Sequence, residues 1–145
     1  MTDLLKLHRE RLPPMMRLIG ADLTVVEKAR IVGTLPVRHE LGNGYNVMHG
    51  GAFMAFADHI GATCAVLNLP EGARTATIES KTNFFAPGKI GDVLTAEAVP
   101  LHVGRRTIVA QTRITAPSGR LLALVTQTQI VKSREEVARE LAAER

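Results

Sequence analysis

The chain has 145 residues and a formal net charge of +4, and its length favours a single domain, residues 1–145, that can bury a substantial core. One cysteine excludes an intrachain disulfide, CxxC redox chemistry and a cysteine-based zinc site, and no metal site is expected. Because the basic residues are dispersed and only 3% of the residues are aromatic, we expect no nucleic-acid partner. The cysteine usage fits a reducing compartment, so the expected location is cytoplasmic.

The first predicted element, in an N-terminal helical segment over residues 1–20, is a short amphipathic helix that two consecutive prolines end. These prolines also break the apolar stretch that a signal peptide needs, so we expect no leader. Apolar residues then alternate with polar ones over residues 23–37, which predicts one long or two short strands. A polar loop with two glycines follows, over residues 39–48.

An apolar run over residues 50–67 predicts one long helix, which Asn68 and Pro70 would end. Its length would suffice for a membrane span, but Asp58 near its centre would cost roughly 2.5–3.5 kcal/mol on insertion scales. We therefore expect a helix buried in protein and no membrane partner. The helix is apolar nearly all round, which is more than packing against one sheet requires, so a partner subunit is expected to cover part of it.

The start and the middle of this helix carry the candidate chemistry. An acid in such an apolar run costs stability unless it is paired or used, which makes Asp58 the first candidate. Gly50 and Gly51 leave the free N–H groups of the helix start open to a substrate carbonyl. Gly50 and Asp58 are about 12 Å apart along a helix, so one carbonyl can contact both only if a second helix of a two-fold dimer brings the acid.

The rest of the chain predicts a sheet and a final helix. Four strands of about ten residues are separated by short glycine- or proline-containing connections, which favours an antiparallel meander. Ser133 and Glu136 match a capping box at the start of a short C-terminal helix or tail over residues 133–145. One apolar helix and one long antiparallel sheet predict an α+β fold in which the curved sheet wraps the helix. The four predicted strands cover residues 75–85, 93–103, 105–116 and 120–131.

The order of these elements resembles the hotdog-fold acyl-CoA thioesterases, and in particular the PaaI-like branch that is linked to phenylacetate degradation. The resemblance implies two protomers that pair their sheets edge to edge, with two active sites at the interface, commonly within a homotetramer. It implies an acyl-CoA thioester as the substrate and no separate cofactor. Its most specific segments are Asn43…His49-Gly50-Gly51…Asp58, then Thr77…Asn83-Phe84…Ala86-Pro87 with Gly91-Asp92, and the turn Gly104-Arg105-Arg106-Thr107.

Carried over by position, the resemblance makes Asp58 the catalytic carboxylate, as nucleophile or as general base. Gly50 would offer its N–H to the thioester carbonyl. Asn43 and His49 would organise the opposite wall and the attacking water, and Thr77 would lie near the acid. A second amide in the same loop, at position 46, is an alternative to Asn43.

Substrate contacts are predicted from chemistry and position. Basic side chains near strand turns could contact the phosphates of coenzyme A; these are Lys89, Arg105 and Arg106. Flexible apolar side chains at the helix start would line the acyl group, without choosing between alkyl and aryl chains. The residues at this end of the helix are Gly51, Phe53, Met54 and Phe56.

Several alternatives stay open at the level of sequence. His49 could only fix the loop, His59 could be a satisfied core or interface histidine, and Cys64 could be a buried small hydrophobe. Asp58 could be a structural carboxylate. The chain could also be a non-catalytic acyl-CoA-binding module or a hydratase or dehydratase, although the latter chemistry usually pairs a histidine with an acid in a different motif.

Overall fold

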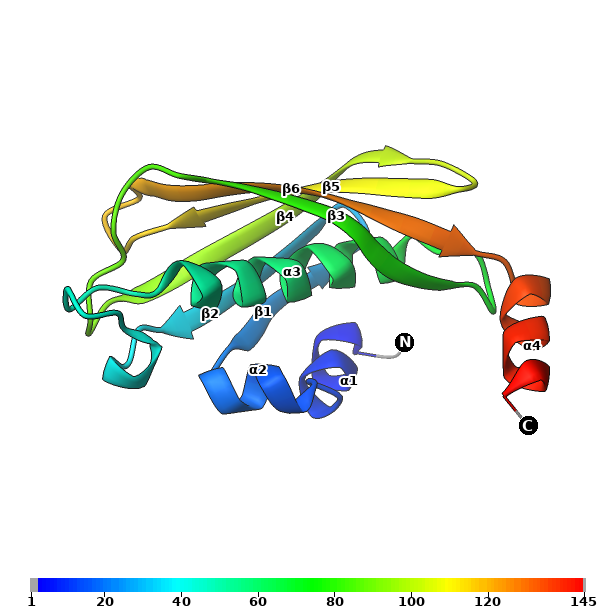
Figure 1. The fold of residues 1–145 in the computed structure, drawn as a ribbon, viewed down its shortest axis with the longest axis horizontal. Coiled ribbons are helices and arrows are strands. Elements are labelled where there is room, and N and C mark those ends of the chain that lie inside the picture. Colours follow the sequence, from blue (N-terminus) through cyan, green and yellow to red (C-terminus); the bar gives the residue numbers. More distant parts are fainter. Residues whose placement is uncertain (1–2, 145) are drawn as a thin grey trace.

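The computed structural model of the chain describes residues 3–144. Figure 1 shows a six-stranded antiparallel sheet that curves around one long helix, α3 (Gly50–Leu67). The strand order across the sheet is β1-β2-β4-β5-β6-β3. This is the hotdog fold that the sequence predicted. The strands are β1 (Asp22–Glu27), β2 (Arg30–Pro36), β3 (Arg74–Phe84), β4 (Val93–Val103), β5 (Thr107–Thr115) and β6 (Leu121–Lys132).

The sheet differs from the predicted meander at one place. Strands β4, β5 and β6 are consecutive antiparallel neighbours, but β3 pairs with β6 and lies at the far edge, away from β4. Residues 85–92 connect β3 to β4 past the start of α3, where the Gly88 carbonyl accepts a hydrogen bond from the Met48 N–H at 2.8 Å. The predicted hairpin between residues 75–85 and 93–103 is therefore wrong, because β5 and β6 lie between β3 and β4 in the sheet and the connection passes around them.

Helix α3 begins and ends where its sequence indicates. Four side chains spaced three or four residues apart form one face that is buried against the sheet: Phe53, Phe56, Ile60 and Cys64. At the end of the helix, Asn68 donates to the carbonyls of Cys64 and Lys28, both at 2.9 Å. Judged only by its length and apolar composition, α3 would also suit a membrane; its buried face shows that it serves as a core helix here.

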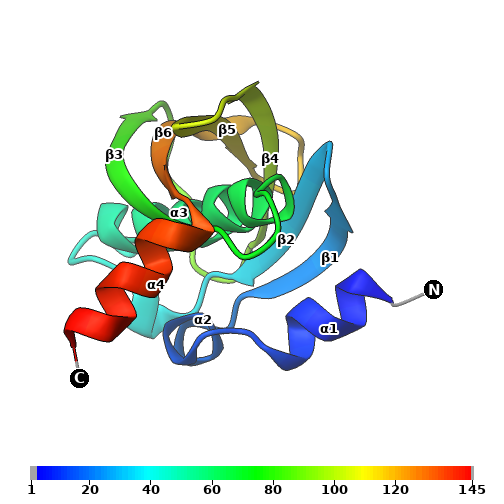
Figure 2. The same cartoon turned by 90° about the vertical axis from the view of Figure 1, so that its right-hand side faces the viewer.

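Shorter helices lie outside the sheet. Figure 2 shows α1 (Leu4–Glu10) beside β1, the strand at one edge of the sheet, whereas β3 forms the other edge. Helix α2 (Pro14–Ile19) lies beneath α3. Met16 and Ile19 of α2 are buried in the core. The predicted capping box is present at the start of α4 (Arg134–Ala143), with Ser133 and Glu136 bonded to each other's N–H groups. A 3-10 turn, η1 (His39–Leu41), precedes the loop that leads into α3.

Candidate active site

Asp58 lies half-buried on the side of α3 that faces β3 and β6. The Thr77 hydroxyl of β3 donates to Asp58 Oδ1 at 2.9 Å. Gln127 Nε2 of β6 lies 3.4 Å from the same oxygen and 3.3 Å from the backbone carbonyl of Asp58. The structure therefore brings Asp58 and Thr77 together, as the resemblance implies, and the carboxylate is hydrogen-bonded from two strands.

Two glutamines of β6 extend this network, and the sequence analysis missed both. Gln129 donates through Nε2 to Thr77 Oγ1 at 2.6 Å. The side chains of Gln127 and Gln129 are buried, with 0% and 1% of their surface exposed. A signal for them exists in the sequence, because they alternate in phase with Val125 and Val131 on the inward face of the strand.

The two glycines at the start of α3 have different roles. His49 is the N-cap residue, and its Nδ1 accepts a hydrogen bond from the Gly51 N–H at 2.9 Å. A neutral ring that accepts at Nδ1 carries its proton on Nε2. The Gly50 N–H has no hydrogen-bond partner among residues 3–144. Of the two predicted glycine donors, Gly50 is thus the one that is free for a ligand.

The loop before α3 holds its shape through its amides. Asn43 Oδ1 accepts from the Tyr45 N–H at 2.8 Å and from the Val47 N–H at 3.5 Å, so this oxygen is used within the loop. Asn46 has a left-handed backbone with φ of 59°, which asparagine tolerates better than most residues. Both asparagines are therefore turn formers, and neither carries a side-chain contact to Asp58 within the protomer.

An apolar hollow of about 320 Å³ lies beside the start of α3. Phe53 and Phe84 pack edge to face across it, with ring centroids 5.9 Å apart. Phe84 is half-exposed, whereas Phe53 is buried. Of the other predicted contacts, Met54 is exposed, Phe56 is fully buried in the core, and neither they nor Gly51 line the hollow. The lining residues are Met48, Gly50, Phe53, Phe84, Ala86 and Pro87.

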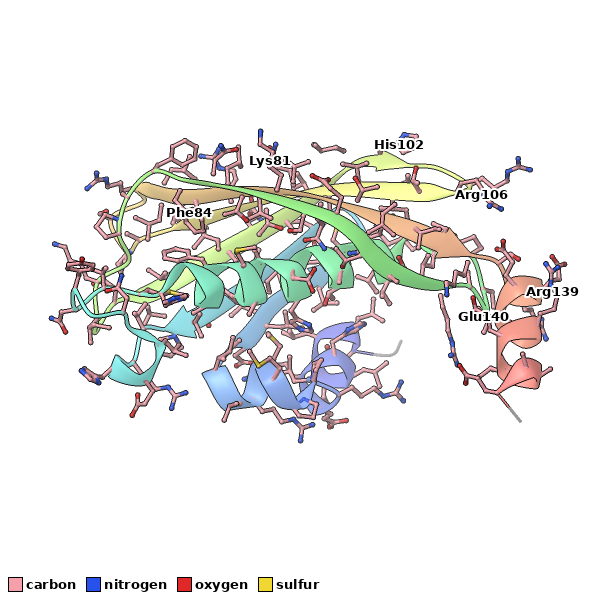
Figure 3. All side chains as sticks on the ribbon, in the orientation of Figure 1. Lys81, Phe84, His102, Arg106, Arg139 and Glu140 are labelled. Atoms are coloured by element: carbon pink, nitrogen blue, oxygen red, sulfur yellow. The ribbon has the colours of Figure 1, made fainter. Side chains whose placement is uncertain are left out.

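The predicted phosphate contacts fall at two ends of the molecule. Lys89 lies near the start of α3, where its backbone bridges to Val47. Arg105 and Arg106 lie at the β4–β5 turn, and Arg106 forms a 3.4 Å ion pair with Glu136. Figure 3 shows Phe84 and Arg106 toward opposite ends of the sheet. One protomer therefore does not bring the arginines to the Gly50 end of its own helix.

Two further ionisable groups of α3 stay apart from the candidate chemistry. Burial lowers the pKa of His59 below its usual 6.5, outweighing the opposite effect of the adjacent Asp58. Its Nε2 is buried without a partner among the described residues, so no core partner satisfies it within the protomer, and an interface partner stays a prediction. Burial raises the pKa of the Cys64 thiol to about 11, as expected for a buried small hydrophobe. No group of three or more potential metal ligands occurs within residues 3–144.

Comparison with known families decides the reaction class. A family model described as the thioesterase superfamily matches residues 45–123, which include the start of α3, Asp58 and Thr77. The chain belongs to this superfamily. Thioester hydrolysis is therefore the reaction class of the chain.

Individual relatives of this superfamily member agree in length and shape. The acyl-coenzyme A thioesterase PaaI of Escherichia coli is 32% identical over 107 residues, which cover 73% of this chain and 74% of PaaI. The crystal structure of a Haemophilus influenzae thioesterase superposes with a TM-score of 0.85 at 26% identity, covering 92% of this chain and 94% of the other. A Streptococcus mutans protein crystallised with acetyl-CoA matches with a TM-score of 0.73 at 27% identity, covering 78% and 89%.

Proposed function

We propose that the chain hydrolyses acyl-CoA thioesters to a free acid and coenzyme A, without a metal or a cofactor of its own. The observation that carries the proposal is the pair of groups beside β3: a carboxylate held by Thr77, and an unpartnered N–H at Gly50. Acyl transfer needs a nucleophile or base together with donors for the developing oxyanion. The names of the PaaI relative and of the acetyl-CoA complex support coenzyme A as part of the substrate.

We propose that each active site forms between two protomers. Gly50 and Asp58 belong to one helix and are about 12 Å apart along it, which is too far for one thioester carbon to reach both. Both lie along β3: Thr77 contacts Asp58, and Phe84 lies 3.3 Å from the position that a Cβ at Gly50 would occupy. A second copy that pairs antiparallel with β3, about a two-fold axis between these two β3 positions, would bring Asp58 to the partner's Gly50.

The free edge of β3 supports this pairing. No other described strand pairs with the outer edge of β3, although the strand has 11 residues. Ile78 and Phe84 are both more than half-exposed on it. Long exposed edges with apolar side chains are usually protected or paired in native proteins. Edge pairing would satisfy the open N–H and carbonyl groups of β3 and would also cover exposed residues of α3.

In this dimer the chemistry follows from the two groups. The Gly50 N–H would polarise the thioester carbonyl, with the acyl chain in the apolar hollow beside Phe53 and Phe84. Asp58 would then attack the carbonyl carbon, release the thiol and leave an anhydride that water hydrolyses, or it would take a proton from the attacking water. Both routes end in a free acid and a thiol.

Replacement of Asp58 by asparagine tests the proposal. Asp58→Asn keeps the size of the side chain but removes the nucleophile or base, so thiol release from a panel of acyl-CoAs should fall by about 10³-fold or more. Glu27→Gln, the same chemical change at an exposed position of β1, should leave turnover unchanged. Size-exclusion chromatography should give the same oligomer for all three proteins. Undiminished turnover in Asp58→Asn would remove Asp58 from the mechanism, and acyl-CoA binding without thiol release by the wild type would refute hydrolysis.

A further inference from the structure

Two buried glutamines beneath the candidate carboxylate require an explanation. Gln127 and Gln129 lie outside the segment that matches the family model, residues 45–123. Both side chains occupy inward positions of β6 where a valine would fit the alternation of the strand. Burying an amide costs free energy unless its hydrogen bonds are made, so two of them in succession indicate a role beyond filling the core.

The hydrogens of the network can be assigned one by one. An ionised carboxylate has no hydrogen to give, so the 2.9 Å contact between Thr77 and Asp58 requires the Thr77 hydroxyl to donate. That hydroxyl has only one hydrogen, and Gln129 must therefore donate to Thr77 Oγ1 across the 2.6 Å contact. The Gln129 carbonyl oxygen then faces the Thr75 hydroxyl at 3.1 Å. By donating to Thr77, Gln129 leaves the single hydroxyl hydrogen of Thr77 for Asp58.

Gln127 presents its amide to the same oxygen at a cost. Its Nε2 faces Asp58, while its Oε1 is buried without a partner in the described part of the chain. Turning the amide over would place that oxygen against the carboxylate. Gln127 Oε1 also lies only 2.1 Å from the position that a Cβ at Gly61 would take, so this approach is open only because residue 61 is glycine. The buried Oε1 of Gln127 without a hydrogen-bond partner is explained if the amide serves to direct its Nε2 toward Asp58.

We propose that Gln127 and Gln129 are positioning residues that fix the direction of the Asp58 carboxylate. Both donors in contact with the carboxylate, Thr77 and Gln127, reach Oδ1, whereas none of residues 3–144 donates to Oδ2. Oδ1 is therefore anchored, and Oδ2 is the oxygen presented to the substrate or to water. The inference rests on the proposed function, because it assigns these residues to the same carboxylate.

A double-mutant cycle tests the route through Thr77. Gln129→Leu and Thr77→Ala should each lower kcat by about 10- to 100-fold with little change in KM, because a displaced group costs rate more than binding. If Gln129 acts through Thr77, the double variant should be no slower than Thr77→Ala alone. Gln111→Leu, the same change on the outer face of β5, should keep the wild-type kcat. Additive losses in the cycle would overturn the role of Gln129.

Stability separates positioning from a structural role for Gln127. Gln127→Leu removes the unmet oxygen, so its melting temperature should equal or exceed that of the wild type while kcat falls. A parallel loss of stability and activity would overturn the role of Gln127. Failure of the proposed function looks different: the wild type would release no thiol, or Asp58→Asn would remain active.

A spectroscopic readout does not depend on activity. Asp58→Asn should move the side-chain amide resonances of Gln127 and Gln129 in ¹H–¹⁵N spectra and leave that of Gln111 in place. With Thr77→Ala already present, the Gln129 resonance should no longer respond to Asp58→Asn. If Asp58→Asn left the Gln129 resonance unchanged when Thr77 is intact, the inference would be overturned. This test does not require Gln129→Leu to fold.

Discussion

At the scale of single residues, the N-cap residue His49 determines which of two adjacent glycine N–H groups stays free for a ligand. His49 takes the Gly51 N–H, so the helix start exposes one free N–H at Gly50. The sequence could indicate that glycines leave this end open, but it could not assign the two N–H groups, because that depends on the rotamer of His49. The sequence also predicted Thr77 near Asp58 only through the family resemblance, since 19 residues separate them along the chain.

Proline at position 50 would remove the N–H group from a backbone that already suits proline. Proline is favoured at the first position of a helix, and His49, at φ −66° and ψ 139°, already has the extended backbone required before proline. We expect Gly50→Pro to lower kcat by about 10²–10³-fold, the usual cost of losing one oxyanion donor. Gly50→Ala is the matched control, because it adds a comparable Cβ near Phe84 but keeps the N–H. Equal losses of acyl-CoA hydrolysis in both variants would show that the N–H is not used.

At the scale of elements, the sequence predicted the pieces better than their arrangement. Helix α3 was predicted over its observed range because an apolar run is bounded there by glycines and by Asn68. The position of β3 was predicted wrongly, because a connection of eight residues is compatible with a hairpin or with a crossing. The structure leaves β3 exposed along most of its length, as expected for an edge strand.

The approach of α3 to β6 depends on Gly61. A methyl group there would overlap the Gln127 amide and push it away from Asp58. Gly61→Ala also gains about 1 kcal/mol of helix propensity, so the net change in unfolding free energy should be small while kcat falls. Chemical denaturation and steady-state kinetics would measure both. In a Gln127→Ala background, which makes room for the methyl group, Gly61→Ala should have no further effect on kcat; a further loss would mean that it acts elsewhere.

At the scale of the whole molecule, the unpaired edge of β3 and the spacing along α3 both favour the proposed dimer. Within one protomer Gly50 and Asp58 are too far apart to contact the same thioester carbon, whereas a two-fold pair would build two complete sites. Arg106 lies toward the opposite end of the sheet from Phe84, the neighbour of Gly50 (Figure 3), so only a second protomer of the proposed dimer could bring it to this site.

Mixing two inactive variants tests the shared site. When Asp58→Asn and Gly50→Pro chains are unfolded and refolded together, half of the dimers should be mixed. Each mixed dimer has one site with an intact Asp58 and an intact Gly50, so about one quarter of wild-type hydrolysis should return. Each variant refolded alone serves as the control. No recovery, despite mixed dimers detected by mass spectrometry, would contradict the shared site.

The hydrogen bonds that hold Asp58 also have a consequence during synthesis of the chain. Its partners come from β3 and from β6, the last strand of the chain, so a ribosome releases the carboxylate about 70 residues before the two glutamines that orient it. A growing or C-terminally shortened polypeptide therefore contains the acid without its support. If the proposed roles hold, the chain gains activity only after its final strand has joined the sheet.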